Sequence, residues 1–168
     1  YLYTLPSVID DIDFNVTHVI RGEDHVTNAA VQIEITEALG GMVPTYAHHS
    51  LLTGADGKGL SKRLGSLSIQ GLRELGLEAM AVVSHAALLG TSDRIHPCAD
   101  YGELVEGFDL GKLSRAPARF DEAELRHPSA RLLHGMPWAA VKDRLGFGSE
   151  AFWLAVRGNI ETLAESKA

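Results

Sequence analysis

The chain has 168 residues and a formal net charge of −7 at pH 7, which is the size of one large domain or two small ones. The net negative charge argues against a surface devoted throughout to nucleic acid, although a local basic face stays possible. The single Cys98 excludes an intrachain disulfide framework and a cysteine-rich zinc site. No apolar run approaches the roughly 18 residues of a membrane span. We therefore expect a cytoplasmic protein with no membrane contact.

The first half predicts two strands. Residues 1–14 are expected to be extended, and the β-branched segment 16–20 predicts a buried strand. Residues 46–52 are typical of a second strand, which leads into a glycine-rich loop. The start at Tyr1 and the uncapped end at 165–168 suggest a piece of a longer protein.

A helix is expected between these strands. Thr27 or Asn28 can cap its first turn, and Gly40-Gly41 ends it. Its expected buried face is Val31, Ile35, Ala38 and Leu39. Strand, helix and strand together predict an α/β fold, in which ligands bind beyond the carboxyl ends of the strands.

The second half is predicted to be mainly helical, with a boundary near residues 65–75. Within it, Phe152-Trp153-Leu154 is expected to pack in a core. The expected helices are 70–75, 78–89, 101–108, 121–125, 137–145 and 149–163.

The loop at 53–65 has four glycines and a short arc of positive charge from Lys58, Lys62 and Arg63. Such a backbone can approach a polyphosphate closely. A Walker A loop does not match, because Leu60-Ser61 stands where that motif requires Lys-Ser or Lys-Thr, and this mismatch weakens the alternative of a P-loop-like phosphate binder. A solvated hairpin is the alternative, since Asp-Gly is a common turn signal.

The segment 21–25, Arg-Gly-Glu-Asp-His, lies where the first strand is expected to end. Arg21 can grip a carboxylate through two parallel hydrogen bonds, and Asp24 or His25 could reach a ribose or an adenine. The alternative is a surface turn with local charge pairing.

The eight histidines do not predict a metal site, because none shows the paired helical spacing of a zinc protease. His48 and His49 are consecutive on an expected strand and should point to opposite faces. The stretch 110–131 is locally basic, which fits either a mixed charged surface or phosphate contacts along an RNA.

Three stretches in order resemble the glutamyl-tRNA synthetases of bacteria. Residues 17–25 resemble the active-site strand of that family, and 51–63 resemble its version of the class I KMSKS loop. Residues 115–125 resemble the segment that leaves its stem-contact region. The resemblance covers nearly the whole chain and is weakest after residue 135.

The resemblance implies a class I aminoacyl-tRNA synthetase with a Rossmann-like nucleotide fold. Such an enzyme activates L-glutamate with ATP and Mg²⁺ and passes the glutamyl group to tRNA(Glu). It implies a monomer and no zinc in these residues, since the family's zinc site belongs to a part before Tyr1. The alternatives are a glutaminyl-type or glutamyl-queuosine-type relative, or a non-catalytic tRNA-binding module.

The resemblance also implies residue roles. Lys62 would stabilise the ATP phosphates in the transition state, and Tyr3, Ser7 and Arg21 would bind glutamate. The ATP-binding residues would be Asp24, His25, Leu51, Leu52, Ser61, Lys62 and Arg63. The tRNA contacts would be Lys112, Arg115 and Arg119.

Three departures from the family pattern stand out. Gly59 replaces the first lysine of the signature loop, and Ser7 stands where many relatives have asparagine. The HIGH motif is absent, so the chain holds half of an active site and is expected to be inactive alone. The implied regions are 1–68, the closing half of the catalytic domain; 69–130, the stem-contact helices; and 131–168, the start of the anticodon-binding domain.

Overall fold

The computed structural model describes residues 3–54, 57, 59 and 68–167. The chain divides into two compact units, each considered by itself. Unit 1 is Tyr1–Leu52 with Ser114–Ala118, and unit 2 is Thr53–Leu113 with Arg119–Ala168.

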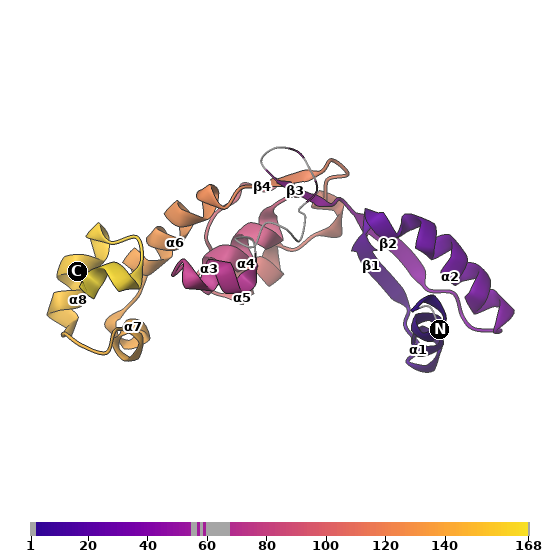
Figure 1. Ribbon diagram of the computed structural model, residues 1–168, viewed down its shortest axis with the longest axis horizontal. Coiled ribbons are helices and arrows are strands. Elements are labelled where there is room, and N and C mark those ends of the chain that lie inside the picture. The colour runs from indigo at the N-terminus through magenta and orange to yellow at the C-terminus, as the bar shows by residue number, and fades with distance from the viewer. Residues whose placement is uncertain (1–2, 55–56, 58, 60–67, 168) are drawn as a thin grey trace. The chain divides into compact units, whose positions relative to one another are not determined.

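Unit 1 contains a parallel β–α–β arrangement with an additional helix before it (Figure 1). Strands β1 and β2 pair in parallel, from His18 opposite Thr45 to Gly22 opposite His49. A short 3₁₀ turn, Glu23–His25, joins β1 to the crossover helix. The elements are α1 (Thr4–Asp13), β1 (His18–Gly22), α2 (Val26–Ala38) and β2 (Thr45–His49). The predicted α/β character is confirmed.

The extended start predicted for residues 1–14 is wrong, because Thr4–Asp13 form helix α1. Apolar residues recur at helical spacing at Leu5, Val8 and Ile12, and Val8 is fully buried. Pro6 does not break the helix, since the first turn has no intrahelical partner for its N–H.

The predicted capping and buried face of α2 are also wrong. The helix begins at Val26 after His25 and has no side-chain cap. Its buried residues are Ala29, Gln32 and Thr36, whereas Val31 and Leu39 are half exposed. The helix therefore buries a polar stripe, and the polar atoms of that stripe need hydrogen-bond partners. The predicted end is confirmed, because Gly40 adopts a left-handed φ of 71°.

Unit 2 is mainly helical, as predicted. Its α-helices are α3 (Ile69–Glu74), α4 (Ala79–Leu88), α5 (Tyr101–Gly107), α6 (Ala123–Gly135), α7 (Trp138–Leu145) and α8 (Glu150–Val156). Short 3₁₀ segments lie at Leu110–Lys112, Arg157–Asn159 and Leu163–Lys167. Strands β3 (Leu52–Gly54) and β4 (Ala118–Phe120) pair with each other, and the division between the units falls inside both strands.

Two predicted helices have different lengths in the structure. Helix α6 runs on past the predicted end at 125, through Pro128, because Leu125, Ser129 and Leu133 are buried along one side. The helix predicted for 149–163 ends at Val156, where a 3₁₀ turn follows. In the predicted segment 152–154 only Trp153 is buried.

Apolar clusters form the core of unit 2. One contains Leu133, Val141, Trp153 and Ile160, and the other contains Leu72, Phe120 and Leu125. Within the described residues, no helix has the length and apolar character needed to cross a membrane.

Candidate functional site

Polar side chains gather on one face of the β1–β2 sheet in unit 1. Arg21 of β1 and Tyr46 and His48 of β2 are half-buried there, and the Arg21 guanidinium carbon lies 5.3 Å from the centre of the Tyr46 ring. Three of their buried atoms, Arg21 Nε, Tyr46 Oη and His48 Nε2, have no hydrogen-bond partner among the described residues. Burial raises the pKa of Tyr46, with Asp11 adding to the effect, so its hydroxyl stays a neutral donor.

Helix α2 holds the Arg21 side chain in place. Arg21 Nη2 donates to Gln32 Oε1 at 2.6 Å and to the His25 carbonyl oxygen at 3.4 Å. Gln32 is itself almost fully buried, and its Nε2 donates to Ser7 Oγ of α1 at 3.3 Å. The guanidinium is thus oriented by an acceptor on one nitrogen while its Nε is left for another acceptor.

Tyr3 lies at the start of α1 and completes this polar group. Its hydroxyl accepts a hydrogen bond from Asn28 Nδ2 at 2.8 Å and lies 3.3 Å from His25 Nδ1. A hydroxyl that accepts from Asn28 can donate to His25 Nδ1, which places the imidazole proton on Nε2. That nitrogen lies 3.8 Å from Asp24 Oδ2.

The carboxyl end of β1 brings Gly22, Asp24 and Leu51 together. A Cβ at Gly22 would lie 2.6 Å from Asp24 Oδ1 and 3.1 Å from Leu51 Cδ2. A side chain at position 22 would therefore displace the Asp24 carboxylate and crowd Leu51.

The chemistry of this group suits a small anion that also accepts and donates hydrogen bonds. A fixed guanidinium supplies positive charge, and the Tyr46 hydroxyl beside it is a neutral donor with no partner among the described residues. A carboxylate is an acceptor of the size and geometry that a guanidinium grips best.

The sequence-predicted glutamate-binding residues come together in the structure. Arg21 and Ser7 are linked through Gln32, and Tyr3 lies beside them through Asn28 and His25.

Of the predicted ATP-binding residues, Asp24, His25 and Leu51 flank the same end of β1. Leu52 begins β3. Ser61, Lys62 and Arg63 lie outside the described residues. In the part of the loop that is described, Gly57 has a left-handed φ of 75°, as a tight glycine turn requires.

The predicted tRNA contacts differ in their own surroundings. Lys112 Nζ is bound to Asp93 Oδ2 at 2.9 Å, whereas Arg115 and Arg119 are exposed.

Sequence reasoning missed Asn28 and Gln32, although a signal was present. His25, Asn28 and Gln32 follow one another at intervals of three and four residues, which places them on one side of a helix. Tyr3 and Ser7 are four residues apart, and the Ser7 N–H donates to the Tyr3 carbonyl at 3.0 Å, so α1 aligns them in the same way.

Known proteins match this chain over almost its whole length. Glutamate–tRNA ligase 1 of Maricaulis maris is 56% identical over 173 residues, which cover 100% of this chain and 39% of that protein. Glutamate–tRNA ligase 2 of Beijerinckia indica is 57% identical, covering 95% of this chain and 37% of that protein. The chain therefore spans less than two fifths of the length of these curated relatives.

Solved structures agree with the sequence relatives. The glutamate–tRNA synthetase of Elizabethkingia anophelis matches with a TM-score of 0.80 and 26% identity, over 98% of this chain and 39% of that one. A glutamate–tRNA ligase from Elizabethkingia meningosepticum, solved in complex with its amino acid, matches with a TM-score of 0.82, also at 26% identity and with the same coverage. The family described as class I tRNA synthetases (E and Q), catalytic domain, matches residues 2–127. The resemblance predicted from the sequence is confirmed, and the chain belongs to the class I (E and Q) tRNA synthetase family.

Proposed function

We propose that the full-length protein carrying this chain ligates L-glutamate to tRNA(Glu) in the cytoplasm, through a glutamyl-adenylate made from ATP. The observation that carries the proposal is the oriented guanidinium of Arg21, held by Gln32 at 2.6 Å with its buried Nε left without a partner. The curated relatives at 56% and 57% identity are named glutamate–tRNA ligases, which supports glutamate as the amino acid.

In this proposal Arg21 binds a carboxylate of glutamate. A guanidinium favours a charged carboxylate over the neutral amide of glutamine. A carboxylate offers two acceptor oxygens to the N–H groups, whereas an amide offers one oxygen and an NH₂ group that can only donate. Tyr3 and Ser7 would fix the substrate's orientation through their hydrogen bonds with Asn28 and Gln32. The proposed site would therefore select glutamate by the charge of Arg21 and by the hydrogen-bond geometry around Tyr3 and Ser7.

We propose that ATP binds beyond the carboxyl end of β1, against Asp24, His25, Leu51 and Leu52. The carboxyl ends of the strands are where α/β sheets bind their ligands, and Asp24 and Leu51 lie together at the end of β1. Mg²⁺ would accompany ATP on its phosphates.

ATP supplies the reactive phosphoanhydride in this proposal. An oxygen of the glutamate carboxylate attacks the α-phosphorus, and pyrophosphate leaves with its electron pair. Lys62 would offset the negative charge that grows on the phosphates, with Ser61 and Arg63 beside it.

The proposed division of labour along the chain follows the resemblance. Residues 1–68 would close the catalytic domain, 69–130 would contact the tRNA stem, and 131–168 would begin the anticodon-binding domain. Arg115 and Arg119 are exposed and suited to phosphate contacts. Lys112 would have to exchange its partner Asp93 for a phosphate, so we expect it to contribute least.

The test uses a full-length enzyme that contains these 168 residues, for example the Maricaulis maris ligase with its matching segment replaced. Arg21→Ala should raise the KM for glutamate at least tenfold in ATP–pyrophosphate exchange while the KM for ATP stays within threefold. Lys62→Ala should lower kcat at least a hundredfold with little change in the glutamate KM. His127→Ala, an exposed change on α6, is the matched control.

Three results would contradict the proposal. Exchange that is supported by glutamine as well as by glutamate would indicate a different amino acid. An Arg21→Ala enzyme that loses only ATP affinity would remove Arg21 from the amino-acid pocket. An unmutated enzyme that binds tRNA with a steep salt dependence but catalyses no exchange would indicate a non-catalytic tRNA-binding module.

A further inference from the structure

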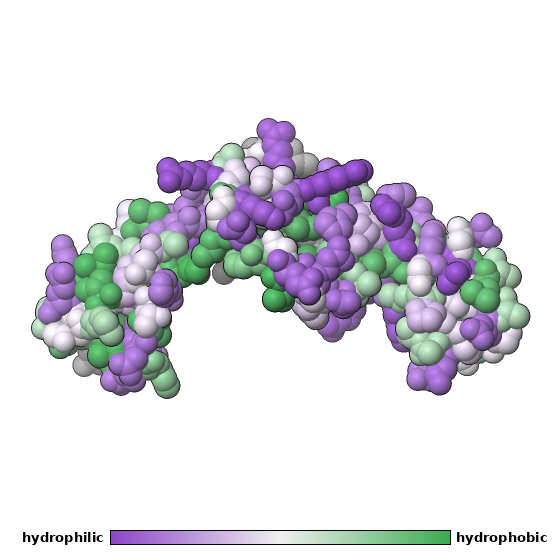
Figure 2. Space-filling view, turned by 180° about the vertical axis from the view of Figure 1, so that it is seen from behind, coloured by the Kyte–Doolittle hydropathy of each residue, from purple (hydrophilic) through white to green (hydrophobic). Residues whose placement is uncertain are grey.

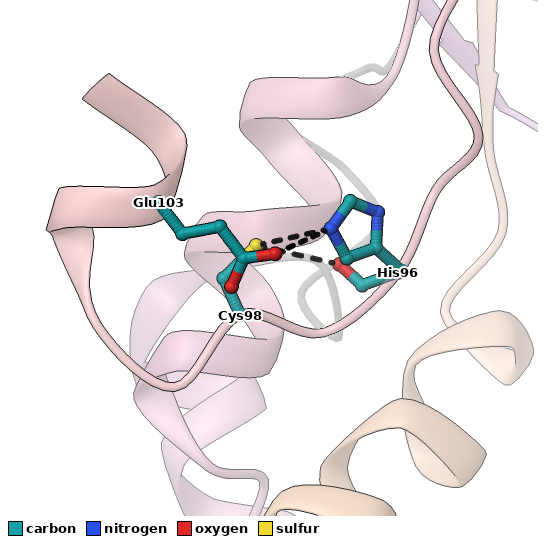
Figure 3. A group of neighbouring side chains, drawn as sticks. All are labelled: His96, Cys98 and Glu103. Atoms are coloured by element: carbon teal, nitrogen blue, oxygen red, sulfur yellow. Dashed lines mark hydrogen bonds and ion pairs between the residues drawn. The ribbon is translucent and has the colours of Figure 1, made fainter. Parts of the chain in front are cut away.

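A second cluster of reactive side chains lies in unit 2, where the segment that joins α4 to α5 meets the first turn of α5. His96, Cys98 and Glu103 point toward one another there, as Figure 3 shows. His96 Nε2 lies 3.6 Å from Cys98 Sγ and 3.0 Å from Glu103 Oε1, and one ligand atom from each of the three residues lies within 4.8 Å of the others. Three different donor types, imidazole nitrogen, sulfur and carboxylate oxygen, thus meet at one point.

The segment that carries His96 and Cys98 is fixed to α4. The Cys98 N–H donates to Ser84 Oγ at 2.9 Å, and the Ser84 hydroxyl donates to the Met80 carbonyl at 2.6 Å. Cys98 and Ser84 are both almost fully buried, so this anchor is shielded from water. The position of the sulfur is therefore set by packing.

The imidazole and the carboxylate are also oriented. His96 Nδ1 lies 2.9 Å from the Arg94 carbonyl oxygen, to which it donates, so Nε2 is the atom directed at the cluster. A ring nitrogen that donates to a backbone carbonyl is the usual support of a metal-bound histidine. Glu103 lies in the first turn of α5, which Asp100 caps by accepting from the Gly102 N–H at 2.7 Å.

A nucleophilic role for Cys98 does not fit this setting. Burial raises the pKa of the Cys98 thiol, so the free thiol is protonated at neutral pH. The pKa of His96 is raised by its hydrogen bonds to the Arg94 carbonyl and to Glu103, so the ring tends to hold its protons. An activated cysteine needs the opposite, a depressed thiol pKa beside a base that can accept the proton.

We propose that His96 Nε2, Cys98 Sγ and Glu103 Oε1 bind one zinc ion, with solvent as a fourth ligand. Zinc binds cysteine sulfur at about 2.3 Å and histidine nitrogen or carboxylate oxygen at about 2.0–2.2 Å, in tetrahedral geometry. Ligand atoms at such distances are separated by roughly 3.3–3.6 Å, which the 3.6 Å between His96 Nε2 and Cys98 Sγ already matches. The Glu103 oxygen has to move a few tenths of an ångström away from His96, and it lies within 4.8 Å of the Cys98 sulfur.

The surroundings allow an ion to enter. A cavity of about 390 Å³ is lined by all three of these side chains and also by Asp93 and Lys112. The Lys112 ammonium is paired with Asp93 at 2.9 Å, and the carboxylate offsets part of its charge. Arg94 also lines the cavity and is the nearest positive side chain in sequence. On binding, zinc replaces the thiol proton of Cys98 and the proton that His96 Nε2 shares with Glu103, and both leave to solvent.

Such a site would tie the irregular segment 91–100 to α5. Zinc that holds residues from a loop and a helix contributes its binding free energy to the fold, as structural zinc sites do. The inference does not depend on the proposed function, because its residues are absent from the site around Arg21. The sequence predicted no zinc in these residues, because the family's zinc site lies elsewhere and the histidines lack the spacing of a zinc protease. Neither argument concerns the distance between His96 and Cys98 in the fold.

The test titrates the chain with Co²⁺, which takes the place of zinc and reports thiolate ligation by a near-ultraviolet charge-transfer band. We expect one Co²⁺ per chain, a band of tetrahedral thiolate type and displacement of Co²⁺ by one equivalent of Zn²⁺. Cys98→Ser should abolish the band. His96→Ala and Glu103→Gln should weaken Co²⁺ binding at least tenfold, while His127→Ala, at an exposed position of α6, should leave the affinity unchanged.

Two outcomes would overturn the proposal. One is a chain that gives no charge-transfer band at millimolar Co²⁺. The other is a band that survives unchanged in His96→Ala or Glu103→Gln. Glu103 is more than half exposed, so Glu103→Gln keeps the fold and decides the matter even if Cys98→Ser fails to fold, which circular dichroism would reveal.

Discussion

The two units differ in what they bury. Unit 1 has small or isolated apolar residues in its interior, Val8 and Ala29, next to the buried polar side chains of Gln32 and Thr36. Unit 2 buries Trp153, Leu125 and other large apolar side chains in two clusters. Hydrophobic residues also reach the surface among hydrophilic ones, as Figure 2 shows. In unit 1, Phe14 is 79% exposed and Met42 is 70% exposed.

The interior of each unit is therefore held together by a different kind of interaction. Unit 2 is stabilised by apolar burial, which is non-directional and proportional to area. In unit 1 the interior is ordered by hydrogen bonds among Arg21, Gln32 and Ser7, which contribute little net stability but fix geometry. Substitutions in unit 2 should therefore change stability, and substitutions in unit 1 should change ligand binding.

Trp153→Ala in unit 2 should have the largest effect. Trp153 is fully buried among Leu133, Val141 and Ile160, and its Nε1–H donates to the Met136 carbonyl at 2.9 Å. Loss of this side chain should lower the free energy of unfolding by about 4 kcal/mol, measured by urea denaturation. Leu154→Ala, next to it but 53% exposed, is the control and should change it by less than about 0.5 kcal/mol. Equal effects of the two changes would contradict the apolar-core account.

Arg144→Ala tests a buried charge in the same unit. The Arg144 guanidinium binds Glu78 through two hydrogen bonds, at 2.7 and 3.0 Å, and the Glu78 side chain is only 6% exposed. Removal of the arginine leaves a buried carboxylate without its partner and should cost about 2 kcal/mol of unfolding free energy. Lys142→Ala, an exposed cation on the same helix α7, should have no measurable effect.

The double variant Arg144→Ala with Glu78→Gln gives the second check on this pair. Because Glu78→Gln removes the buried charge, the double variant should be more stable than Arg144→Ala alone. A double variant that is as unstable as the sum of the single changes would mean that the two residues act independently.

Much of the fold could be predicted from the sequence, because periodicity is a local property. The β-branched run ending in β1, the glycine stop after α2 and the apolar pattern of α4 all gave the correct type of element. The predictions that failed depend on tertiary contacts, which a local sequence pattern does not contain. In α2 the apolar stripe through Val31 and Leu39 suggested the wrong buried face, since the face that packs is the one whose polar groups find partners on α1 and β1.

The candidate site was predicted in part for a similar reason. Arg21, Tyr3 and Ser7 could be named because the chain resembles a known family, and hydrogen bonds through Gln32, Asn28 and His25 bring them near one another. Gln32, which connects them, lies in an ordinary helical stretch and has no motif of its own. Its 2.6 Å bond to Arg21 spans 11 residues, and only the β1–α2 geometry brings the two side chains together.

Gln32→Met tests whether the hydrogen bonds of Gln32 in unit 1 serve ligand binding or stability. Methionine keeps the length and apolar volume of the side chain but removes the acceptor for Arg21 and the donor for Ser7. In the full-length enzyme the KM for glutamate should rise about tenfold, equivalent to about 1.4 kcal/mol, because the guanidinium loses its orientation. The free energy of unfolding should change by less than about 1 kcal/mol. The reverse pattern, a stability loss without a change in KM, would show that Gln32 is a packing residue only.

Ser7→Ala should have the smallest effect of the series. The Ser7 hydroxyl accepts from Gln32 Nε2 at 3.3 Å, a long hydrogen bond, and Gln32 keeps its short bond to Arg21 without it. We expect the KM for glutamate to rise less than threefold and the unfolding free energy to stay within about 0.5 kcal/mol. Ser7→Asn, which restores a longer polar side chain at this position, should bring the KM back to the starting value or below it. A rise of tenfold or more in Ser7→Ala would mean that Ser7 binds glutamate directly rather than through Gln32.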